Sequence, residues 1–389
     1  MFYYFRLDPF IYTSGPQKNK MLFYNTLDSS YVLYHIDLEE QLILSNSILT
    51  IKTNDSNIPK LISMLEEKNM GVIIKGTSHV FSLNMLERLS SNYNELDNVY
   101  NPLANDNLLD HLFEITYCFK RLDIQSLNVD KISKQYSLFS YNHDSEYINY
   151  QLIKDVLSEN IYQNLSTINY VGINCSDFES NIIPIYEETS YYPSNIVLPY
   201  SKYILECKSN PYLKYIIICD SQMIDEFEYF INNVDKSKVV IYFYIGSEEE
   251  YSSISSKLNI LKKMHYKLFT YQKCNDDFLD NNIKYSIDEV LCQRHNVNQI
   301  IRSGIINELF YGKITIHNNG EVYSNIQQKT LGNIKDQKFK TLLHKASVDK
   351  SSWRLTRDNY FSCNDCLFKR ICPPISEIEQ YTLKVYCIK

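Results

Sequence analysis

Hydrophobic and polar residues alternate along the first 36 positions of the chain, and this alternation predicts a small sheet. The runs FYYFRLDPFIYTS and KMLFYNTLDSSYVLYHI both have the period of β-strands. Gly15 and the proline after it predict the turn that joins the two strands, because this pair favours turn geometry. The chain is therefore expected to begin with a hairpin.

A helix is predicted after the hairpin, over residues 55–69, with Asp55 or Ser56 as its N-cap. The following run MGVII returns to a strand pattern, so strands, helix and closing strand are expected to form one N-terminal module over residues 1–100. The polar run SSNYNELDNVYNPLANDN is the expected linker. The apolar residues at helical spacing are Ile58, Leu61, Ile62 and Leu65.

Strands and helices then alternate over residues 105–300, which predicts an α/β domain. The strand-like runs LKYIIICD, KVVIYFYIG and HYKLFTYQ are separated by the helix-like runs MIDEFEYFINNV and SEEEYSSISSKLNILKKM. Earlier strands are expected at LFEITYCF and INYVGINC, with a helix over residues 146–159 between them. At least five parallel strands follow, in a sheet covered on both faces. Roughly 170 residues are too few for a complete eight-unit barrel but fit a partial (β/α) barrel.

A third region is expected over residues 305–389. The run YGKITIHNNGEVYSNI predicts a hairpin, and its Asn-Asn-Gly turn ending at Gly320 favours positive φ angles. A helix is predicted over residues 336–346, before the last cysteines of the chain.

Composition and charge indicate a globular protein and argue against some classes of partner. The chain of 389 residues is 44% hydrophobic and 22% charged, which is a normal balance for a globular protein. A formal net charge of −7 argues against a nucleic-acid partner, since such proteins neutralise phosphates. The N-terminus has no secretory signal pattern and no apolar run reaches membrane-spanning length, so we expect a cytoplasmic protein without a membrane contact.

Four cysteines near the C-terminus, Cys363, Cys366, Cys372 and Cys387, form a C-x2-C-x5-C-x14-C array. Closely spaced thiolates are the ligands of zinc and of iron–sulfur clusters, so the array predicts a metal site. Disulfides are the alternative, but they are typical of oxidising compartments and small secreted folds. The Cys-Pro-Pro sequence at Cys372 favours iron over zinc, although four cysteines alone fit both.

The rest of the sequence contains no clear catalytic or nucleotide-binding motif. There is no G-x-G-x-x-G, G-x-S-x-G or H-E-x-x-H, and GVIIKGTS lacks the lysine of a phosphate loop, with Gly71 expected as a helix C-cap. Cys292 and His295 form an isolated C-x2-H, which we interpret as a helix-end cysteine and a solvated histidine. The remaining cysteines are interpreted as core residues or inert thiols. They are Cys118, Cys175, Cys207, Cys219 and Cys274.

These C-terminal parts together resemble a known family. The hairpin ITIHNNGEVYSN, then SSWRLTR, CNDCLFKRICPPIS and Cys387, resemble the SPASM-type domain of radical S-adenosylmethionine (SAM) peptide-modifying enzymes. Trp353 and Arg357, followed by CxDCLFxxxCPPISxxE, are similar to pseudo-radical-SAM proteins encoded in maturation clusters for ribosomally synthesised peptides (RiPPs) with double-glycine-type precursors. Those relatives keep the scaffold without the catalytic cluster.

The resemblance assigns roles to positions of this sequence. Gly320 matches the glycine of the family's G-x4-C, but Asn325 stands at its cysteine, no cysteine occurs at 304–310, and Ser376 replaces the x3-C position after Cys372. The first auxiliary cluster is thus expected to be lost. In contrast, the resemblance makes Cys363, Cys366, Cys372 and Cys387 the four ligands of the second cluster, a [4Fe-4S] cluster with zinc as the alternative.

The radical-SAM reaction needs C-x3-C-x2-C, and the sequence contains no such triplet. The run after LFEITYCF, residues 120–144, has no cysteine, and the glycine-rich SAM contact is reduced to Gly172. Because three thiolates are indispensable for that cluster, we expect no SAM, no catalytic residue and no cofactor site beyond the metal.

The fold expected from all of this is α/β: a degenerate partial (β/α) barrel of radical-SAM type, an N-terminal winged-helix-like module and a C-terminal SPASM-like domain. The module's element order resembles domains that bind a leader peptide as an added strand. We expect a non-catalytic partner in RiPP maturation that binds the precursor peptide, a true radical-SAM enzyme, or both. The alternatives are an iron–sulfur electron-transfer or other enzyme of the same pathway, and a zinc-stabilised interaction protein.

Overall fold

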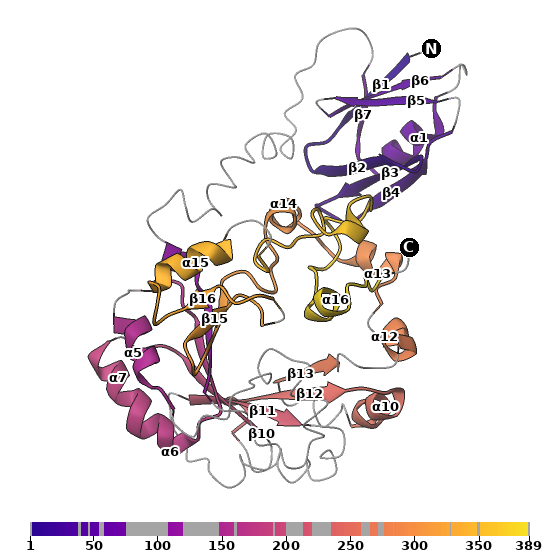
Figure 1. Cartoon of the computed structure of the whole chain (residues 1–389). Coiled ribbons are helices and arrows are strands. Elements are labelled where there is room, and N and C mark those ends of the chain that lie inside the picture. Colours follow the sequence, from indigo (N-terminus) through magenta and orange to yellow (C-terminus); the bar gives the residue numbers. More distant parts are fainter. Residues whose placement is uncertain are drawn as a thin grey trace.

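The computed structural model describes residues 2–37, 40–45, 47–53, 58–74, 108–119, 148–158, 162–189, 191–199, 213–219, 235–257, 265–270, 276–282, 284–326, 328–347 and 351–387. Within these residues the chain is a mixed α/β fold with three sheets (Figure 1). Two small sheets belong to the N-terminal module, and the third is a nine-stranded sheet. None of the described helices is long and apolar enough to cross a membrane.

The N-terminal module has two sheets, one of order β5-β6-β1-β7 and one of order β2-β3-β4, with helix α1 packed against them. Its core contains Phe5, Phe23, Leu49 and Leu65, all fully buried, so both sheets and the helix share one apolar interior. The elements are β1 (Phe2–Leu7), β2 (Ile11–Gln17), β3 (Lys20–Asn25), β4 (Tyr31–His35), β5 (Gln41–Ser45), β6 (Ile48–Lys52), α1 (Lys60–Glu67) and β7 (Gly71–Ile73).

The predicted hairpin is present, but its turn is not at Gly15. Strand β2 continues through Gly15 to Gln17, with a shift of register after Ser14, and pairs with β3 up to Gln17 and Lys20. The turn consists of Lys18 and Asn19, whose φ angles of 48° and 60° suit a tight hairpin connection. The two predicted strands are in fact four, because each run is interrupted by a short turn.

The predicted helix begins later than expected. Asp55 and Ser56 lie outside the described residues, and α1 starts after Pro59 with no side-chain cap. Leu61, Ile62 and Leu65 are fully buried as predicted, whereas Ile58 is 51% exposed and precedes the helix.

Gly71 is not the helix C-cap, because the left-handed residue after α1 is Asn69, with φ 53°. Gly71 lies in β7, and a Cβ there would stand 2.0 Å from the Arg6 carbonyl oxygen of β1. The glycine is therefore required by close contact between two strands. Residues 75–78 of the phosphate-loop look-alike lie outside the described residues.

The described part of residues 1–74 thus contains seven strands and one helix. The winged-helix resemblance stays a prediction, and the expected linker at residues 90–107 lies outside the described residues.

The nine-stranded sheet has the order β13-β12-β11-β10-β9-β8-β14-β15-β16. Its strands β8 to β13 are parallel and follow the sequence without a reversal. Parallel strands in sequence order are typical of a barrel segment, whereas the strand order of a doubly wound sheet reverses. The strands are β8 (Glu114–Cys118), β9 (Thr167–Val171), β10 (Ser194–Pro199), β11 (Leu213–Cys219), β12 (Val239–Ile245), β13 (His265–Thr270), β14 (Lys313–His317), β15 (Glu321–Tyr323) and β16 (Gly332–Asn333).

The sheet curves, and β14 and β15 run at a large angle to β12 and β13 (Figure 1). One face is apolar and packs against the helices, with Tyr117 and Tyr170 fully buried there. The other face carries polar groups: the Asn169 side chain donates to Glu114 (2.9 Å), and the Asn195 side chain donates to Asn169 (2.8 Å). Val171 and Val197 lie on the same face and are buried, so this face combines polar and apolar side chains, and nothing here contradicts the predicted cover on both faces.

The predicted strands of this sheet are confirmed, and β10 was missed because SNIVLP is short and follows a proline. Helix α5 lies within the predicted range, and α10 is the described start of another predicted helix, while the helix at residues 223–234 lies outside the described residues. The helices are α5 (Gln151–Ser158), α6 (Cys175–Asp177), a π-helical turn (Phe178–Ile182), α7 (Ile183–Glu188), α10 (Glu248–Ser256), α12 (Asp276–Asn282), α13 (Ile287–Cys292), α14 (Val297–Ile305), α15 (Phe339–Ser347) and α16 (Glu377–Thr382).

The predicted C-terminal hairpin is confirmed as β14 and β15, with Gly320 at φ 94° in its turn. Strand β14 also pairs with β8 in parallel, so the hairpin extends the main sheet at the edge where the parallel run begins. The predicted helix at 336–346 is confirmed as α15.

The buried His317, the last residue of β14, should make the free energy of unfolding depend on pH. Its ring packs on Tyr323, and burial lowers its pKa to about 4, only partly opposed by the charge of Glu321. His317 therefore binds a proton more readily in the unfolded state than in the folded state. The free energy of unfolding should fall by roughly 3 kcal/mol as the pH falls from 6.5 to below 4.

His317→Gln should flatten the dependence of the unfolding free energy on pH in this range, measured by denaturant titration. His35→Gln replaces an exposed histidine and serves as the control. An unchanged slope in His317→Gln would contradict the buried neutral imidazole.

Candidate metal centre

The four cysteines of the array lie on three segments near the C-terminus. Cys363 ends a short 3-10 turn, and the backbone N–H of Cys366 donates to the Cys363 carbonyl (2.9 Å), which closes the C-x2-C turn. Cys372 follows, its N–H bonded to the Phe368 carbonyl (2.8 Å). The eight cysteines among the described residues are all free thiols.

The C-terminal segment brings Cys387 back to the other three cysteines. Cys387 forms a β-bridge with Tyr285, just before α13, and the Tyr285 N–H donates to the Tyr386 carbonyl (3.3 Å). This contact fixes a segment that is 15 residues beyond Cys372 in the sequence.

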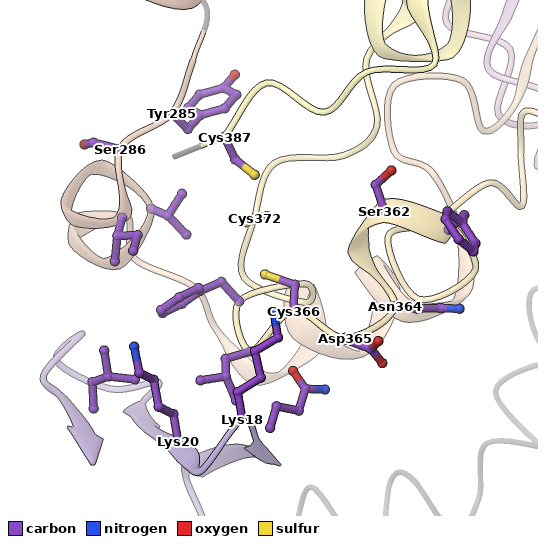
Figure 2. A pocket seen from close by; sticks show the side chains of 17 residues that line it. Lys18, Lys20, Tyr285, Ser286, Ser362, Asn364, Asp365, Cys366, Cys372 and Cys387 are labelled. Atoms are coloured by element: carbon purple, nitrogen blue, oxygen red, sulfur yellow. The ribbon is translucent and has the colours of Figure 1, made fainter. Parts of the chain in front are cut away.

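Three of the thiols face a common space. Cys366, Cys372 and Cys387 line a pocket of about 560 Å³, and Figure 2 shows the Cys366 and Cys387 sulfurs directed into the space beside Cys372. Burial raises the pKa of the Cys372 thiol to about 12, Arg357 opposes the rise, and the charges of Cys366, Cys387 and Cys363 add to it. The other three thiols are thus within electrostatic range of Cys372.

Arg357 is a buried cation, 4% exposed, that contacts the cysteine-bearing segments. Its Nη1 donates to the Cys363 sulfur (3.4 Å), and its Nε donates to the carbonyl of Pro373, the residue after Cys372 (2.5 Å). Its two Nη atoms hold the Glu379 carboxylate at 3.2 Å. Burial alone disfavours the charged guanidinium, but Glu379 and the thiols outweigh it and raise the pKa of Arg357.

Glu379, on α16, is 2% exposed and completes the connection. Its Oε2 accepts from the backbone and hydroxyl of Ser376 (2.9 and 3.0 Å), which forms the capping box of α16. Its Oε1 accepts from the N–H of Tyr386, the residue before Cys387 (3.4 Å). The Arg357–Glu379 pair therefore contacts a residue at or next to Cys363, Cys372 and Cys387.

The donor set suits a soft metal, since thiolates are the ligands of zinc and iron–sulfur centres. No three His, Cys, Asp or Glu side chains in the described part of the chain stand at metal-ligating distances. The structure therefore gathers the four predicted residues in one place without arranging a coordination shell, and the metal stays a proposal.

The positions that the resemblance assigns to a lost cluster are occupied by hydrogen-bonding residues. Ser376 caps α16, and the side chain of Asn325, 3% exposed, donates to Gln380 on the same helix (2.9 Å). Asn307, 1% exposed, lies in the stretch without the expected cysteine and donates to the carbonyls of Leu355 (3.0 Å) and Ile375 (2.9 Å). Polar contacts thus join the segments at these positions.

The N-terminal module packs directly on the cysteine loop. Leu22 and Tyr24 of β3 share an apolar cluster with Leu367 and Ile371, which lie between Cys366 and Cys372. The Tyr24 hydroxyl also donates to the Gln293 carbonyl after α13 (2.6 Å). The loop that carries two of the cysteines is therefore part of the surface that holds the module.

The other candidate residues lie apart from this cluster. Cys292 is exposed at the end of α13 as predicted, but His295 is half-buried rather than solvated, and burial lowers its pKa. Cys118, Cys175 and Cys219 are buried in the main core, and the pKa of Cys118 is raised to about 12 by burial. The segment at 120–144 and two further cysteines, Cys207 and Cys274, lie outside the described residues.

Sequence reasoning missed part of the site. The sequence signal for Glu379 is the capping box Ser-x-x-Glu at Ser376, which marks the start of a helix. Lys18, Lys20 and Tyr285 also line the pocket, but they come from distant parts of the chain, and no local pattern identifies them.

Comparison with known proteins gives little further information. No protein family and no curated protein matches the chain. Among solved structures, the crystal structure of Streptococcus suis SuiB bound to S-adenosylmethionine is similar, with a TM-score of 0.46 and 14% identity over 95% of this chain and 93% of that one. A likeness at this level assigns neither fold family nor function.

The buried ion pair predicts strong energetic coupling. Arg357→Met or Glu379→Met alone should lower the unfolding free energy by about 3–5 kcal/mol, because each leaves an unpaired buried charge. The double variant Arg357→Met/Glu379→Met should lose much less than the sum, in a double-mutant cycle measured by denaturant unfolding.

The exposed pair Lys154–Glu188 is the control, with an expected coupling below about 1 kcal/mol. Additive losses at Arg357 and Glu379 would show that the two residues do not act as a unit.

Proposed function

We propose that this chain is a non-catalytic, pseudo-radical-SAM partner in the maturation of a ribosomally synthesised peptide. It would bind the precursor peptide, a true radical-SAM enzyme, or both. The observation that carries the proposal is a contrast within one sequence: the C-terminal cysteine array is complete, whereas C-x3-C-x2-C occurs nowhere. Without three closely spaced thiolates the chain cannot hold the cluster that cleaves SAM.

The fold supports this proposal. Six parallel strands in sequence order, with helices packed on one face, fit a partial barrel of radical-SAM type. The hairpin β14–β15, buried Trp353 and the cysteine loop are the parts on which the SPASM resemblance rests, and Trp353 Nε1 donates to the Lys313 carbonyl at the start of the hairpin (2.9 Å). The SPASM-like region would thus be joined to the barrel sheet.

Cys363, Cys366, Cys372 and Cys387 would hold one [4Fe-4S] cluster, with zinc as the alternative. A bound metal would cross-link the three cysteine-bearing segments and contribute free energy of folding. The role proposed for the metal is structural. It would add a second cross-link to the segments that the Arg357–Glu379 pair joins through hydrogen bonds.

The N-terminal module would supply peptide recognition. Strands β2 and β4 form the edges of the three-stranded sheet, and edge strands present the backbone groups that an added peptide strand can pair with. The winged-helix-like role of this module is part of the proposal.

Binding tests the proposed function directly. Isothermal titration of the purified chain should show association with the precursor peptide or the radical-SAM enzyme encoded beside it. A scrambled precursor of the same composition is the control. If the chain bound neither the precursor peptide nor the enzyme, the proposed function would be wrong.

Metal content tests the centre. The anaerobically purified chain should contain about four irons and four sulfides. One zinc without sulfide would instead establish the zinc alternative and exclude electron transfer by this site.

Cys366→Ser should lower the melting temperature and the metal content together, whereas Cys292→Ser, an exposed cysteine outside the cluster, should change neither. Unchanged stability of Cys366→Ser would contradict the structural role of the metal.

A further inference from the structure

One sheet of the N-terminal module carries apolar side chains on both of its faces. Its strands β5, β6, β1 and β7 direct Phe5, Leu49 and Ile51 inward, where these residues share the core with helix α1. Successive strand residues point to opposite sides, so the residues between them lie on a second face, which we call the outer face. The outer face consists of Phe2, Tyr4 and Arg6 on β1, Ile48, Thr50 and Lys52 on β6, Gln41, Ile43 and Ser45 on β5, and Val72 of β7 with Ile74 after it.

The outer face is exposed although it carries large apolar side chains. Phe2 is 56% exposed, Ile43 59% and Val72 47%. Tyr4, in the middle of β1, is 37% exposed. In Figure 1 this sheet lies on the side of the module away from the C-terminal region, whereas the sheet β2-β3-β4 packs on the cysteine loop. Neighbouring apolar side chains that are exposed in this way are typical of a docking surface, because a sheet normally buries its apolar faces against other elements.

Two cations lie on the outer face, and none of its residues is a carboxylate or a thiol. Lys52 lies over the Phe2 ring, with its Nζ 6.0 Å from the ring centroid, at one end of the face. Arg6 lies at the other end, beside Val72 of β7. Since the whole chain has a net charge of −7, the outer face is a locally positive region of an acidic protein. Charge complementarity therefore favours an acidic partner at this surface.

The dimensions of the outer face match one short helix. Strands lie about 4.8 Å apart and rise about 3.4 Å per residue, so four strands and the run from Phe2 to Arg6 form a surface of about 14 by 14 Å. An α-helix with its side chains is about 10 Å wide and rises about 1.5 Å per residue, so about nine residues would span this surface. Because Lys52 pairs with Phe2, the backbones of the two cations stand about 14 Å apart, within reach of long acidic side chains two helical turns apart.

A second copy of the chain and a membrane fit the outer face less well than such a helix. In a two-fold dimer the same surface would occur on both sides, so Arg6 and Lys52 would meet a face without carboxylates. Lipid-binding clusters contain about four to eight cations, whereas this face has two in a chain of net charge −7. A segment of another protein that carries its own carboxylates would satisfy both the apolar and the cationic groups.

We propose that the outer face binds an amphipathic helix of a partner protein, with apolar side chains packed on Tyr4 and Ile43 and carboxylates at Arg6 and Lys52. The sheet would then be covered by a helix on each side, α1 within the module and the partner's helix outside it. This surface is separate from the cysteine cluster and from the strand edges proposed for peptide recognition, and the inference does not rest on the proposed function.

Fluorescence anisotropy with labelled helical peptides tests the proposal on the full-length chain. The probe is an alanine-based helix with leucines on one face and two glutamates on the same face, two turns apart. It should bind, and glutamine in place of both glutamates should weaken binding about tenfold. A scrambled sequence that spreads the leucines around the helix should not bind. Equal affinity for the three peptides would overturn the proposal.

Charge reversal locates the site. Arg6→Glu/Lys52→Glu should lose the glutamate peptide and should bind a peptide with lysines at the same two positions, a gain that misfolding cannot produce. Ile43→Thr keeps a β-branched residue on an exposed strand position and should weaken binding of the glutamate peptide roughly fivefold.

Lys60→Glu/Lys68→Glu is the matched control, because it reverses two exposed lysines of the same module that lie outside the outer face. The affinity of this variant for the glutamate peptide should equal that of the unaltered chain. A loss of the same size in the control, or no binding of the lysine peptide by Arg6→Glu/Lys52→Glu, would show that the outer face is not the site.

Two further measurements identify any other occupant. Sedimentation equilibrium should give the same mass for the unaltered chain and for Ile43→Thr. A dimer that this substitution dissociates would make the occupant a second copy and overturn the partner helix. Vesicles that contain phosphatidylserine should not bind the chain, and vesicle binding that is lost in Arg6→Glu/Lys52→Glu would make the occupant a membrane, with the same consequence.

Discussion

The ion pair between Arg357 and Glu379 is the contact on which the arrangement of the C-terminal region depends. Two ionised groups that are almost fully buried need their hydrogen-bonding capacity satisfied, because desolvation is costly. They are satisfied by the segments that carry Cys363, Cys372 and Cys387, and by the cap of α16. Three of the four cysteines are therefore positioned by two residues outside the cysteine array.

In the same region, side-chain hydrogen bonds join segments that are distant in the sequence. Where the SPASM resemblance expects ligands of another cluster, Asn325 and Ser376 bond to residues of α16, and Asn307 bonds to the carbonyl before Ser376. A cluster and a set of amide hydrogen bonds differ in strength, but both cross-link segments distant in sequence. The C-terminal segments are therefore held together at these positions without cysteine ligands.

Much of the fold followed from periodicity. The strands of the parallel sheet and the hairpin β14–β15 were predicted from local patterns, and the spacing of the cysteines led us to expect Cys366, Cys372 and Cys387 near one another. The turn at Lys18 and Asn19 was not, because Gly15 gave the stronger turn signal, although Gly15 lies within strand β2 at a shift of register. The hydrogen-bonded Asn169 and Asn195 of the sheet and the lysines of the pocket were missed for another reason. Both arise from tertiary packing, which leaves no local pattern.

The parallel pairing of β14 with β8 has a consequence for how the chain acquires its fold. Strand β8 gains β9 as a neighbour early in synthesis, but its other edge is filled by residues that follow almost 200 positions later. Such long-range pairing slows folding, and an unpaired strand edge invites association between chains. A ribosome-bound or truncated chain that ends before β14 would therefore expose β8 at the edge of the sheet, so the C-terminal hairpin protects a strand made much earlier.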